Sequence, residues 1–353
     1  MHSILVTGGA GFIGANFVHY WLAHHPQDRV VVLDALTYAG NHASLRSLEV
    51  RDTFRFVHGN IRDQQLVERL LREERLDTIV HFAAESHVDR SILGPDAFIE
   101  TNILGTHALL KAARQVWLEA GGSIPHHRFH HVSTDEVYGS LGIGGQSFTE
   151  ITPYSPNSPY AASKAASDHL VRAYRQTYGL NTTLSNCSNN YGPYQFPEKL
   201  IPLCIINLLK QEPLPIYGDG KNIRDWLHVA DHCRGIELIL ENGKPGCSYN
   251  IGGNNERTNL QVVSALCAIM DELNPEFAPH QRLVKFVTDR PGHDRRYAIN
   301  SRKITSELGY RPAREFVIGL RETIEWYINN KSWWQSILSG EYKDWMKLQY
   351  GEG

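Results

Sequence analysis

The sequence lacks several features that would place it outside ordinary globular proteins. Its five cysteines are widely spaced and form no C-x-x-C pair, which disfavours a disulfide framework and a cysteine-rich metal site. No window approaches the roughly 20 consecutive apolar residues that span a bilayer. The longest apolar run, residues 200–209, lies between Lys199 and Lys210, so we expect a buried helix there. A net charge of -3 disfavours a nucleic-acid partner bound by bulk electrostatics.

The chain also lacks the usual signs of export and of metal binding. Residues 1–9, "MHSILVTGG", run into a predicted strand without the basic segment of a signal peptide. Together with the unpaired cysteines this favours a cytoplasmic protein. Among the 18 histidines, "HHRFHH" at residues 126–131 is the densest group. We interpret it as a solvated loop that leads into a strand, and we expect no metal site.

The first half of the chain alternates apolar strands with helical segments. Such alternation implies right-handed crossovers, a parallel sheet and a doubly wound α/β domain. After about residue 190 the order becomes irregular, which indicates a smaller α+β lobe. Strands are predicted at residues 3–8, 29–34, within 54–63, and at 77–84 and 128–134, and helices at 11–25, 64–74 and 96–116.

A glycine-rich turn between the first strand and first helix is typical of a dinucleotide site. "VTGGAGFIG" places Gly8, Gly11 and Gly14 where the backbone can approach a pyrophosphate at a helix N-terminus. Asp34 closes the second strand, where its carboxylate can accept hydrogen bonds from ribose hydroxyls and repel a 2′-phosphate. The pattern therefore favours NAD over NADP. Asp63 has two compatible interpretations, a contact at the adenine end and a helix N-cap.

A second pattern indicates acid–base chemistry. Tyr160 and Lys164 in "YAASK" lie four residues apart, hence on one face of a helix, where a lysine ammonium can lower the pKa of the phenol. "HHVSTDEVYG" (residues 130–139) places Thr134, Asp135 and Glu136 at a predicted strand end. Two adjacent carboxylates cannot both ionise easily, so one can give a proton while the other takes one.

Taken together, these segments resemble the extended short-chain dehydrogenase/reductases, and among them the sugar-nucleotide 4,6-dehydratases. The resemblance covers nearly the whole chain. It rests on "TGGAGFIG", "LTYAGN", "FAAESHVDRSI", "STDEVYG", "SPYAASKAASDHLV", "NCSNNYGPYQFPEKLIP", "YGDGKNIRDWLHV" and "DRPGHDRRYAI". It implies a Rossmann domain that binds NAD, mainly residues 1–190 with Tyr160 and Lys164, and a nucleotide-sugar lobe, mainly residues 191–353, with segments interleaved between them.

The resemblance also implies an activity, the dehydration of dTDP-glucose to a 4-keto-6-deoxy sugar at the start of deoxysugar biosynthesis, for example of rhamnose. It implies that Tyr160 deprotonates the 4-hydroxyl while hydride passes to NAD, and that Thr134 binds the sugar. Glu136 then removes the proton at carbon 5, and protonated Asp135 assists loss of the carbon 6 hydroxyl. Hydride finally returns to carbon 6.

The resemblance further implies binding residues and partners. For the cofactor these are Gly8, Gly11, Phe12, Ile13, Gly14, Asp34, Ala35, Leu36, Thr37, Asn60, Ile61, Phe82, Ala83, Ala84, Glu85, Ser86, Thr101, Tyr160, Lys164 and Asn190. For the substrate they are Ser86, Thr134, Asn189, Glu198, Lys199, Pro215, Ile216, Tyr217, Arg224, Asn259, Asp289, Arg290, His293 and Tyr297. Ala35 and Asn60 depart from the family's usual Lys and Asp, which bears on how tightly NAD is retained. A homodimer through a four-helix interface is also implied.

Three alternatives stay open from the sequence. A UDP-sugar 4-epimerase and a UDP-glucuronate decarboxylase share the Tyr and Lys but do not need the Asp–Glu pair. A non-catalytic NAD-sensing protein would keep the fold without needing either pair. No motif separates a thymine from a uracil base, because the difference is one methyl group, which is worth about 1 kcal/mol.

Overall fold

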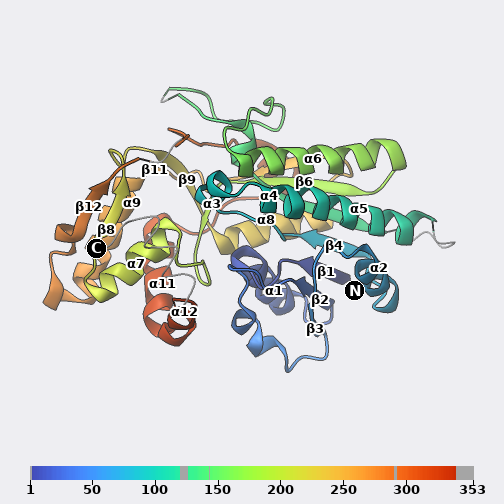
Figure 1. Ribbon diagram of the computed structural model, residues 1–353, viewed down its shortest axis with the longest axis horizontal. Helices are drawn as coiled ribbons and strands as arrows, with labels where there is room; N and C mark the ends of the chain where they lie inside the picture. Colours follow the sequence, from blue (N-terminus) through green and yellow to red (C-terminus); the bar gives the residue numbers. More distant parts are fainter. Residues whose placement is uncertain (1, 120–125, 143, 290–291, 339–353) are drawn as a thin grey trace.

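The structure is a computed structural model that describes residues 2–119, 126–142, 144–289 and 292–338. Its centre is a seven-stranded parallel sheet with strand order β10-β6-β5-β4-β1-β2-β3 (Figure 1). The strands are β1 Ser3–Thr7, β2 Arg29–Asp34, β3 Phe54–His58, β4 Thr78–His81, β5 Arg128–Thr134, β6 Thr182–Cys187 and β10 Ser248–Ile251. This confirms the predicted doubly wound α/β fold.

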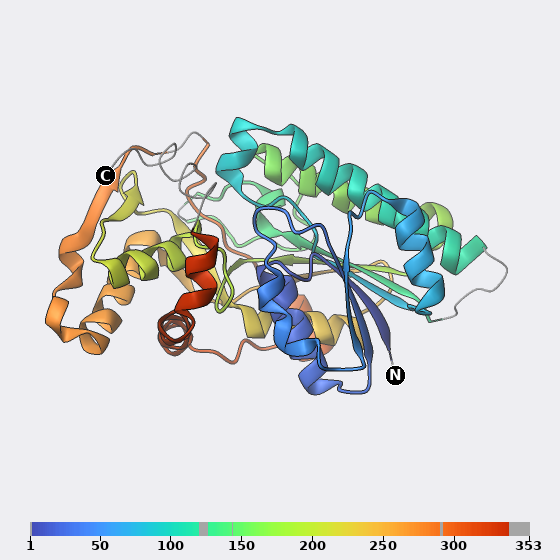
Figure 2. The same cartoon turned by 60° about the horizontal axis from the view of Figure 1, so that its bottom comes forward.

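Both faces of the sheet are buried, as its continuous apolar strands require. Ile4 and Val6 face α1 and α8, whereas Leu5 faces α2, α5 and α6, because side chains alternate along a strand. Figures 1 and 2 show these two helix layers on either side of the strands. The helices are α1 Phe12–His24, α2 Gln64–Glu73, α5 Thr106–Arg114, α6 Pro159–Tyr178 and α8 Val229–Asn242, with the shorter α3 Val88–Leu93 and α10 Arg302–Leu308.

The helix expected at residues 96–116 is not one continuous α-helix. It begins as α4 Asp96–Phe98, continues as a π-helix over Ile99–Gly105, becomes α5, and ends as a second π-helix over Gln115–Glu119. The first π-helix contains Asn102, whose side chain bonds the Glu85 backbone and Ser163. Wide helical turns of this kind are frequent at functional sites.

The C-terminal lobe confirms the expected smaller α+β unit, and it lies to the left in Figure 1. Its helices pack around one apolar core that contains the predicted buried helix, now α7. The lobe contains β7 Asn189–Tyr191, β8 Leu214–Tyr217, β9 Ile223–His228, β11 Glu256–Thr258 and β12 Val284–Val287, with α7 Leu200–Lys210, α9 Asn259–Leu273, α11 Phe316–Asn329 and α12 Lys331–Ile337. β10 crosses back into the large sheet, so segments of the two lobes alternate along the chain. The exact domain boundary stays a prediction.

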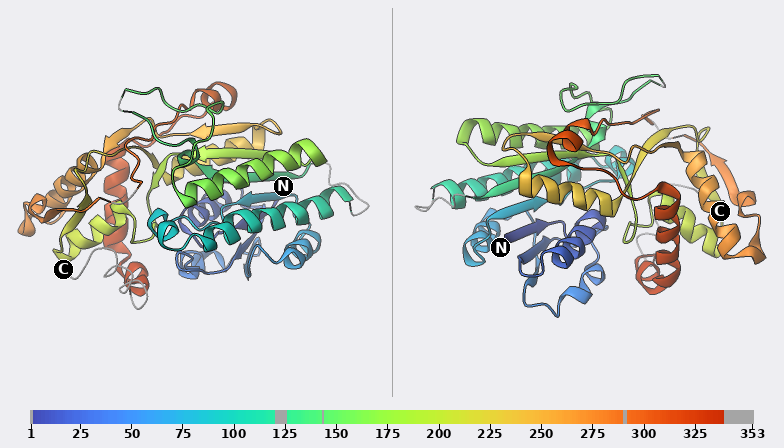
Figure 3. Two further views of the ribbon diagram at one scale, coloured as in Figure 1. Left: turned by 45° about the horizontal axis from the view of Figure 1, so that its top comes forward. Right: turned by 180° about the vertical axis from the view of Figure 1, so that it is seen from behind.

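An aromatic cluster joins the two lobes. Tyr194 packs against Trp326 and Trp333 on one side and stacks on His19 of α1 on the other. The Trp333 indole also donates a hydrogen bond of 3.0 Å to Ser44, in the connection between β2 and β3. Figure 3 shows α11 and α12 beside this part of the first lobe. The last described helices therefore brace the larger lobe as well as their own.

Three further expectations concern histidines, a helix cap and membranes. His130 and His131 are buried within β5, so only the first part of "HHRFHH" precedes the strand. Asp63 caps α2, accepting a hydrogen bond from the Leu66 amide at 3.0 Å. Within the described ranges, no helix combines the length and apolarity needed to cross a bilayer.

Candidate active site

The main cleft opens at the carboxyl ends of the parallel strands, where β1 lies between β2 and β4. At this point the chain reverses its direction of winding, so the connections leave a crevice between them. The wall is formed by the glycine turn, the ends of β2, β4 and β5, the start of α6 and the segment after β7. Residues far apart in the sequence thereby meet at one place.

The glycine turn has no room for side chains at two positions. Gly8 has a φ of +70°, and an added Cβ would lie 2.5 Å from the Ala83 amide nitrogen. A Cβ on Gly14 would collide with the Gly8 carbonyl oxygen. Gly11 caps α1 without any side-chain hydrogen bond, so backbone groups form this end of the helix. The turn fits the pyrophosphate of a dinucleotide, since it offers backbone N–H groups and a positive dipole end.

Asp34 connects the glycine turn to the end of β2. Its two carboxylate oxygens accept hydrogen bonds of 2.8 Å from the Ala10 and Leu36 amides. Burial raises the pKa of this carboxyl group, and the two amides act in the opposite direction. Leu36 has a φ of +50° and lies outside the cleft lining, behind the carboxylate. Asn60 also lines the cleft, and its side-chain oxygen accepts a 2.9 Å hydrogen bond from the Arg62 amide.

Almost all residues expected to hold the cofactor line this single cleft. They are Gly8, Gly11, Phe12, Ile13, Gly14, Asp34, Ala35, Thr37, Asn60, Ile61, Phe82, Ala83, Ala84, Glu85, Ser86, Thr101, Tyr160, Lys164 and Asn190.

The Asp–Glu pair occupies a 3₁₀ turn, Asp135–Tyr138, directly after β5. The Thr134 hydroxyl caps this turn by accepting a bond from the Glu136 amide at 3.3 Å. Asp135 is 2% exposed, and among the described residues its Oδ2 has no hydrogen-bond partner. Burial, with the charges of Glu136 and Asp225, raises the pKa of Asp135 well above its usual range. Such a pair can combine a proton donor with a proton acceptor.

Tyr160 and Lys164 lie in the first turns of α6, which begins after the Ser158 cap. Burial and the nearby Glu136 raise the pKa of the Tyr160 phenol, and a hydrogen bond to Thr134 opposes them. Lys164 is not among the principal causes of this shift, and the expected lowering of the Tyr160 pKa by its ammonium stays a prediction. The Lys164 ammonium instead donates 2.9 Å to the Val132 carbonyl, and burial lowers the pKa of Lys164 to about 8.

The far wall of the cleft carries the first group of expected substrate residues. Asn189, Glu198, Lys199 and Ser86 line it, and Lys199 donates 3.1 Å to the Ser86 carbonyl. Glu198 is buried, lies 3.3 Å from Arg90, and among the described residues its Oε1 has no hydrogen-bond partner. Such an oxygen can accept a hydrogen bond from a sugar hydroxyl.

The second group of expected substrate residues lies outside the cleft lining, in the C-terminal lobe. The Arg224 guanidinium stacks over the Tyr297 ring at 4.4 Å, and its charge reaches Asp135. His293 lies 2.6 Å from the Asp289 carboxylate and beside the Tyr217 ring. Pro215 and Ile216 belong to β8, Asn259 begins α9, and Arg290 lies outside the described residues.

Sequence reasoning missed several residues of this site. Tyr38, Cys187, Gln195 and Phe196 also line the cleft, and the Arg90 guanidinium lies 3.9 Å over the Tyr38 ring. The segments "LTYAGN" and "NCSNNYGPYQFPEKLIP" contain all four, but the directions of their side chains depend on tertiary packing. Asn102 offers no sequence signal beyond a polar residue inside an apolar helix.

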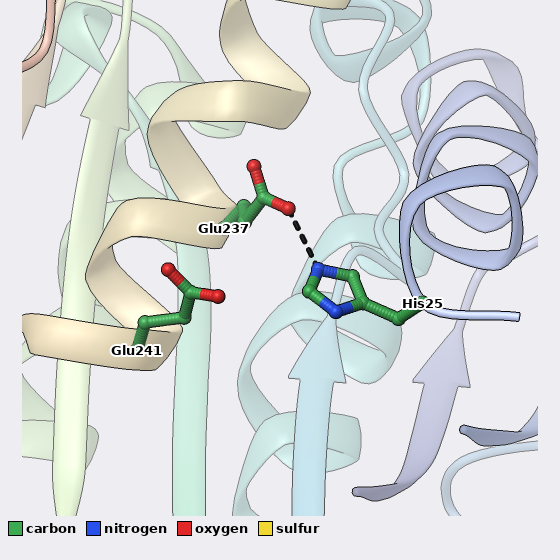
Figure 4. Close-up of side chains that lie close together, drawn as sticks. All are labelled: His25, Glu237 and Glu241. Atoms are coloured by element: carbon green, nitrogen blue, oxygen red, sulfur yellow. Dashed lines mark hydrogen bonds and ion pairs between the residues drawn. The ribbon is translucent and has the colours of Figure 1, made fainter. Parts of the chain in front are cut away.

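A group of potential metal ligands lies away from the cleft. His25, Glu237 and Glu241 place ligand atoms within 4.8 Å of one another, between the end of α1 and α8 (Figure 4). His25 and Glu237 already form a 2.7 Å hydrogen bond, and Glu241 is exposed. α1 starts at the cleft, so its 13 residues separate the two places by about 20 Å. These side chains do not belong to the active site.

Comparison with known proteins places this geometry in a family. The family model described as GDP-mannose 4,6 dehydratase matches residues 5–323. The chain belongs to this family. A dTDP-glucose 4,6-dehydratase from Xanthomonas campestris pv. campestris (strain B100) is 56% identical over 346 residues, which cover 97% of this chain and 98% of the relative.

Solved structures of family members agree with the fold. The dTDP-glucose 4,6-dehydratase of Streptomyces venezuelae, with NAD and TYD bound, is 51% identical with a TM-score of 0.87, covering 95% of this chain and 99% of that one. A UDP-glucose 4-epimerase of Thermotoga maritima shares the fold at 27% identity and a TM-score of 0.82, covering 93% and 99%. Sequence similarity therefore favours the dehydratases over the epimerases.

Proposed function

We propose that this protein is a hydro-lyase that dehydrates dTDP-glucose to dTDP-4-keto-6-deoxyglucose with NAD as its cofactor. The observation that carries the proposal is the buried Asp135 beside Glu136, at the same cleft as Tyr160. An epimerase has no need for a proton donor next to a proton acceptor, whereas elimination of water needs both. Relatives more than half identical to this chain carry the name of this activity.

The cofactor fits the glycine turn, with Asp34 placed for the adenosine ribose. Bound NAD supplies a hydride acceptor for carbon 4 of the sugar and later a hydride donor for carbon 6. Because the hydride is returned, the reaction consumes no external reductant.

The chain's own residues move the protons. Tyr160 takes the proton of the 4-hydroxyl, and Thr134, which hydrogen-bonds the phenol, orients it. The resulting ketone acidifies the proton at carbon 5, which Glu136 removes. Asp135 gives its proton to the departing carbon 6 hydroxyl, since burial raises its pKa and so favours the protonated form. Glu136 then returns a proton to carbon 5.

The substrate is proposed to span both lobes. Glu198 and Asn189 would bind the sugar, and Lys199 and Arg224 the diphosphate, because both are cations near the cleft. Arg224 is buried and its planar guanidinium is suited to bidentate contact with phosphate oxygens. The base would lie toward β8 and Tyr217. Contacts there would also be made by Pro215, Ile216, Asn259, Asp289, Arg290, His293 and Tyr297.

The test is a mass-spectrometric assay of the purified protein with dTDP-glucose deuterated at carbon 4. We expect the product to have lost one water and to carry the deuterium at carbon 6, with no net NADH formed. Product of unchanged mass would instead indicate an epimerase. Unchanged substrate with tight NAD binding would favour a non-catalytic sensing protein.

We also propose a cytoplasmic homodimer built on α5 and α6. The two helices pack against each other on one face of the sheet (Figure 3), and exposed apolar side chains lie at their edges and in the preceding π-helix. Ile99 is 44% exposed, Leu104 52% and Tyr178 41%. A second copy would bury this surface. Light scattering of Leu104→Asp beside the native protein tests the dimer, with a shift to monomer expected.

The proposed cytoplasmic location is supported by the cysteines. All five are free thiols, which suits a reducing compartment.

A further inference from the structure

A buried polar network behind the active site is not used by the proposed reaction. It starts at Lys164, whose ammonium lies 3.4 Å from the Nε2 of His131. The same Nε2 lies 3.2 Å from the Oδ1 of Asp168, one helical turn after Lys164 on α6. The side chains of His131 and Asp168 are both 0% exposed. A charged lysine and a carboxylate therefore share one enclosed space with an imidazole between them.

The surroundings favour a negative charge on Asp168. Its Oδ2 accepts hydrogen bonds of 2.9 Å from the Ser133 and Tyr154 hydroxyls, both of which stabilise a carboxylate. Arg172, one turn further along α6, donates 3.0 Å to the Tyr154 hydroxyl and adds positive charge nearby. Burial alone opposes ionisation, since it raises the pKa of Asp168.

The histidine contributes no charge of its own. Burial and the Lys164 ammonium lower the pKa of His131 well below its usual range, so the ring is neutral. Around Lys164 the remaining titratable groups are His81 on β4 and Cys187 on β6, and around Asp168 the phenol of Tyr138. None of these is a carboxylate. Among the described groups that act on Lys164, Asp168 is therefore the principal negative charge.

We propose that Asp168, which meets Lys164 at the same Nε2 atom of the neutral His131 ring, is the buried counter-ion that keeps Lys164 protonated at the active site. Asp168 is thus a positioning residue, since it touches neither cleft nor substrate. The inference rests on the proposed function only through the role of Lys164 as a cation beside Tyr160. Without Asp168, desolvation would act on Lys164 unopposed, and the ammonium would be lost at lower pH.

The first test is the pH profile of kcat for Asp168→Asn. We expect its alkaline limb to move down by about one pH unit or more, with much of the activity recovered at mildly acidic pH. Tyr154→Phe is the matched control, because it removes a hydrogen bond from the same carboxylate and keeps the charge. Its limb should stay in place. A uniform loss of activity at all pH values in Asp168→Asn would overturn the proposal.

The second test does not depend on turnover. Lys164→Met leaves Asp168 as an uncompensated buried charge, so adding Asp168→Asn to it should raise the melting temperature. In the native background the same Asp168→Asn change should lower it. This reversal of sign identifies an ion pair, and additive effects would contradict it. If dTDP-glucose is not dehydrated at all, the melting cycle still decides the pairing, which keeps the two proposals separable.

Discussion

The sheet side of the proposed site and its C-terminal lobe are built on different principles. On the side of the large sheet, Asp34 ends a parallel strand, and Gly8 and Asp135 each directly follow one, so regular structure places them. On the side of the C-terminal lobe, Arg224 and Tyr297 are held by stacking and hydrogen bonds between β9 and loop segments. The sheet side carries the proposed chemistry and the C-terminal lobe the proposed recognition of the nucleotide. Substitutions should therefore change kcat on the sheet side and KM in the lobe.

The largest expected effect is on the sheet side. Asp135→Asn removes the proposed proton donor, and general acid catalysis is typically worth about 10²–10⁴ in rate. We expect kcat to fall by about 10³, with KM for dTDP-glucose little changed, in steady-state assays.

The same variant should not be less stable. Because the folded-state pKa of Asp135 is raised, ionisation of this group destabilises the fold as the pH rises through that value. An amide removes the penalty. The melting temperature at pH 8 should therefore equal or exceed that of the native protein, and a large decrease would assign Asp135 a structural role instead.

A smaller effect on activity is expected from substitutions in the C-terminal lobe. Arg224→Lys keeps the charge but loses the planar contact with phosphate and with the Tyr297 ring. We expect KM to rise by about tenfold with kcat nearly unchanged. A loss confined to kcat would contradict the proposed division between chemistry on the sheet side and nucleotide recognition in the C-terminal lobe. Arg321→Lys, on the exposed surface of α11, is a suitable control.

The Asp34 carboxylate should affect the affinity for NAD more than it affects kcat. Asp34→Ala removes the acceptor of the Ala10 and Leu36 amides and the proposed ribose contact. We expect NAD affinity to fall by about ten- to a hundredfold, consistent with loss of 1–3 kcal/mol. Calorimetric titration of cofactor-stripped protein measures this directly. Unchanged affinity would remove Asp34 from the cofactor site.

The smallest effect is expected where the lobes meet. Ser44→Ala deletes the hydrogen bond from the Trp333 indole, which contributes about 1 kcal/mol to the free energy of unfolding. Trp333→Phe removes the same bond together with part of the ring that packs against Tyr194 and Trp326. In chemical denaturation Trp333→Phe should therefore be destabilised more than Ser44→Ala, and adding Ser44→Ala to it should cost little further.

The same contrast explains what the sequence could predict. The alternation of strands and helices predicted the parallel sheet, and the glycine, Asp34 and "STDEVYG" patterns indicated residues that meet at one cleft, because strand ends bring local motifs together. Tyr38, Phe196 and Asn102 were missed, since their positions depend on contacts with distant segments. The π-helix at Ile99–Gly105 was read as ordinary helix because both have similar apolar patterns. The effect of Lys164 on the pKa of Tyr160 stays a prediction, because the spacing of two residues says nothing about the burial and the other charges that act on them.

The aromatic cluster between the lobes has a practical consequence. Trp326 and Trp333 pack against Tyr194, which directly precedes Gln195 and Phe196 of the cleft lining in the chain. The Tyr327 hydroxyl also donates to the Gln195 carbonyl. A ligand that shifts this wall will change the environment of the two indoles. Their intrinsic fluorescence is therefore a built-in reporter of cleft occupancy, readable without labels or turnover.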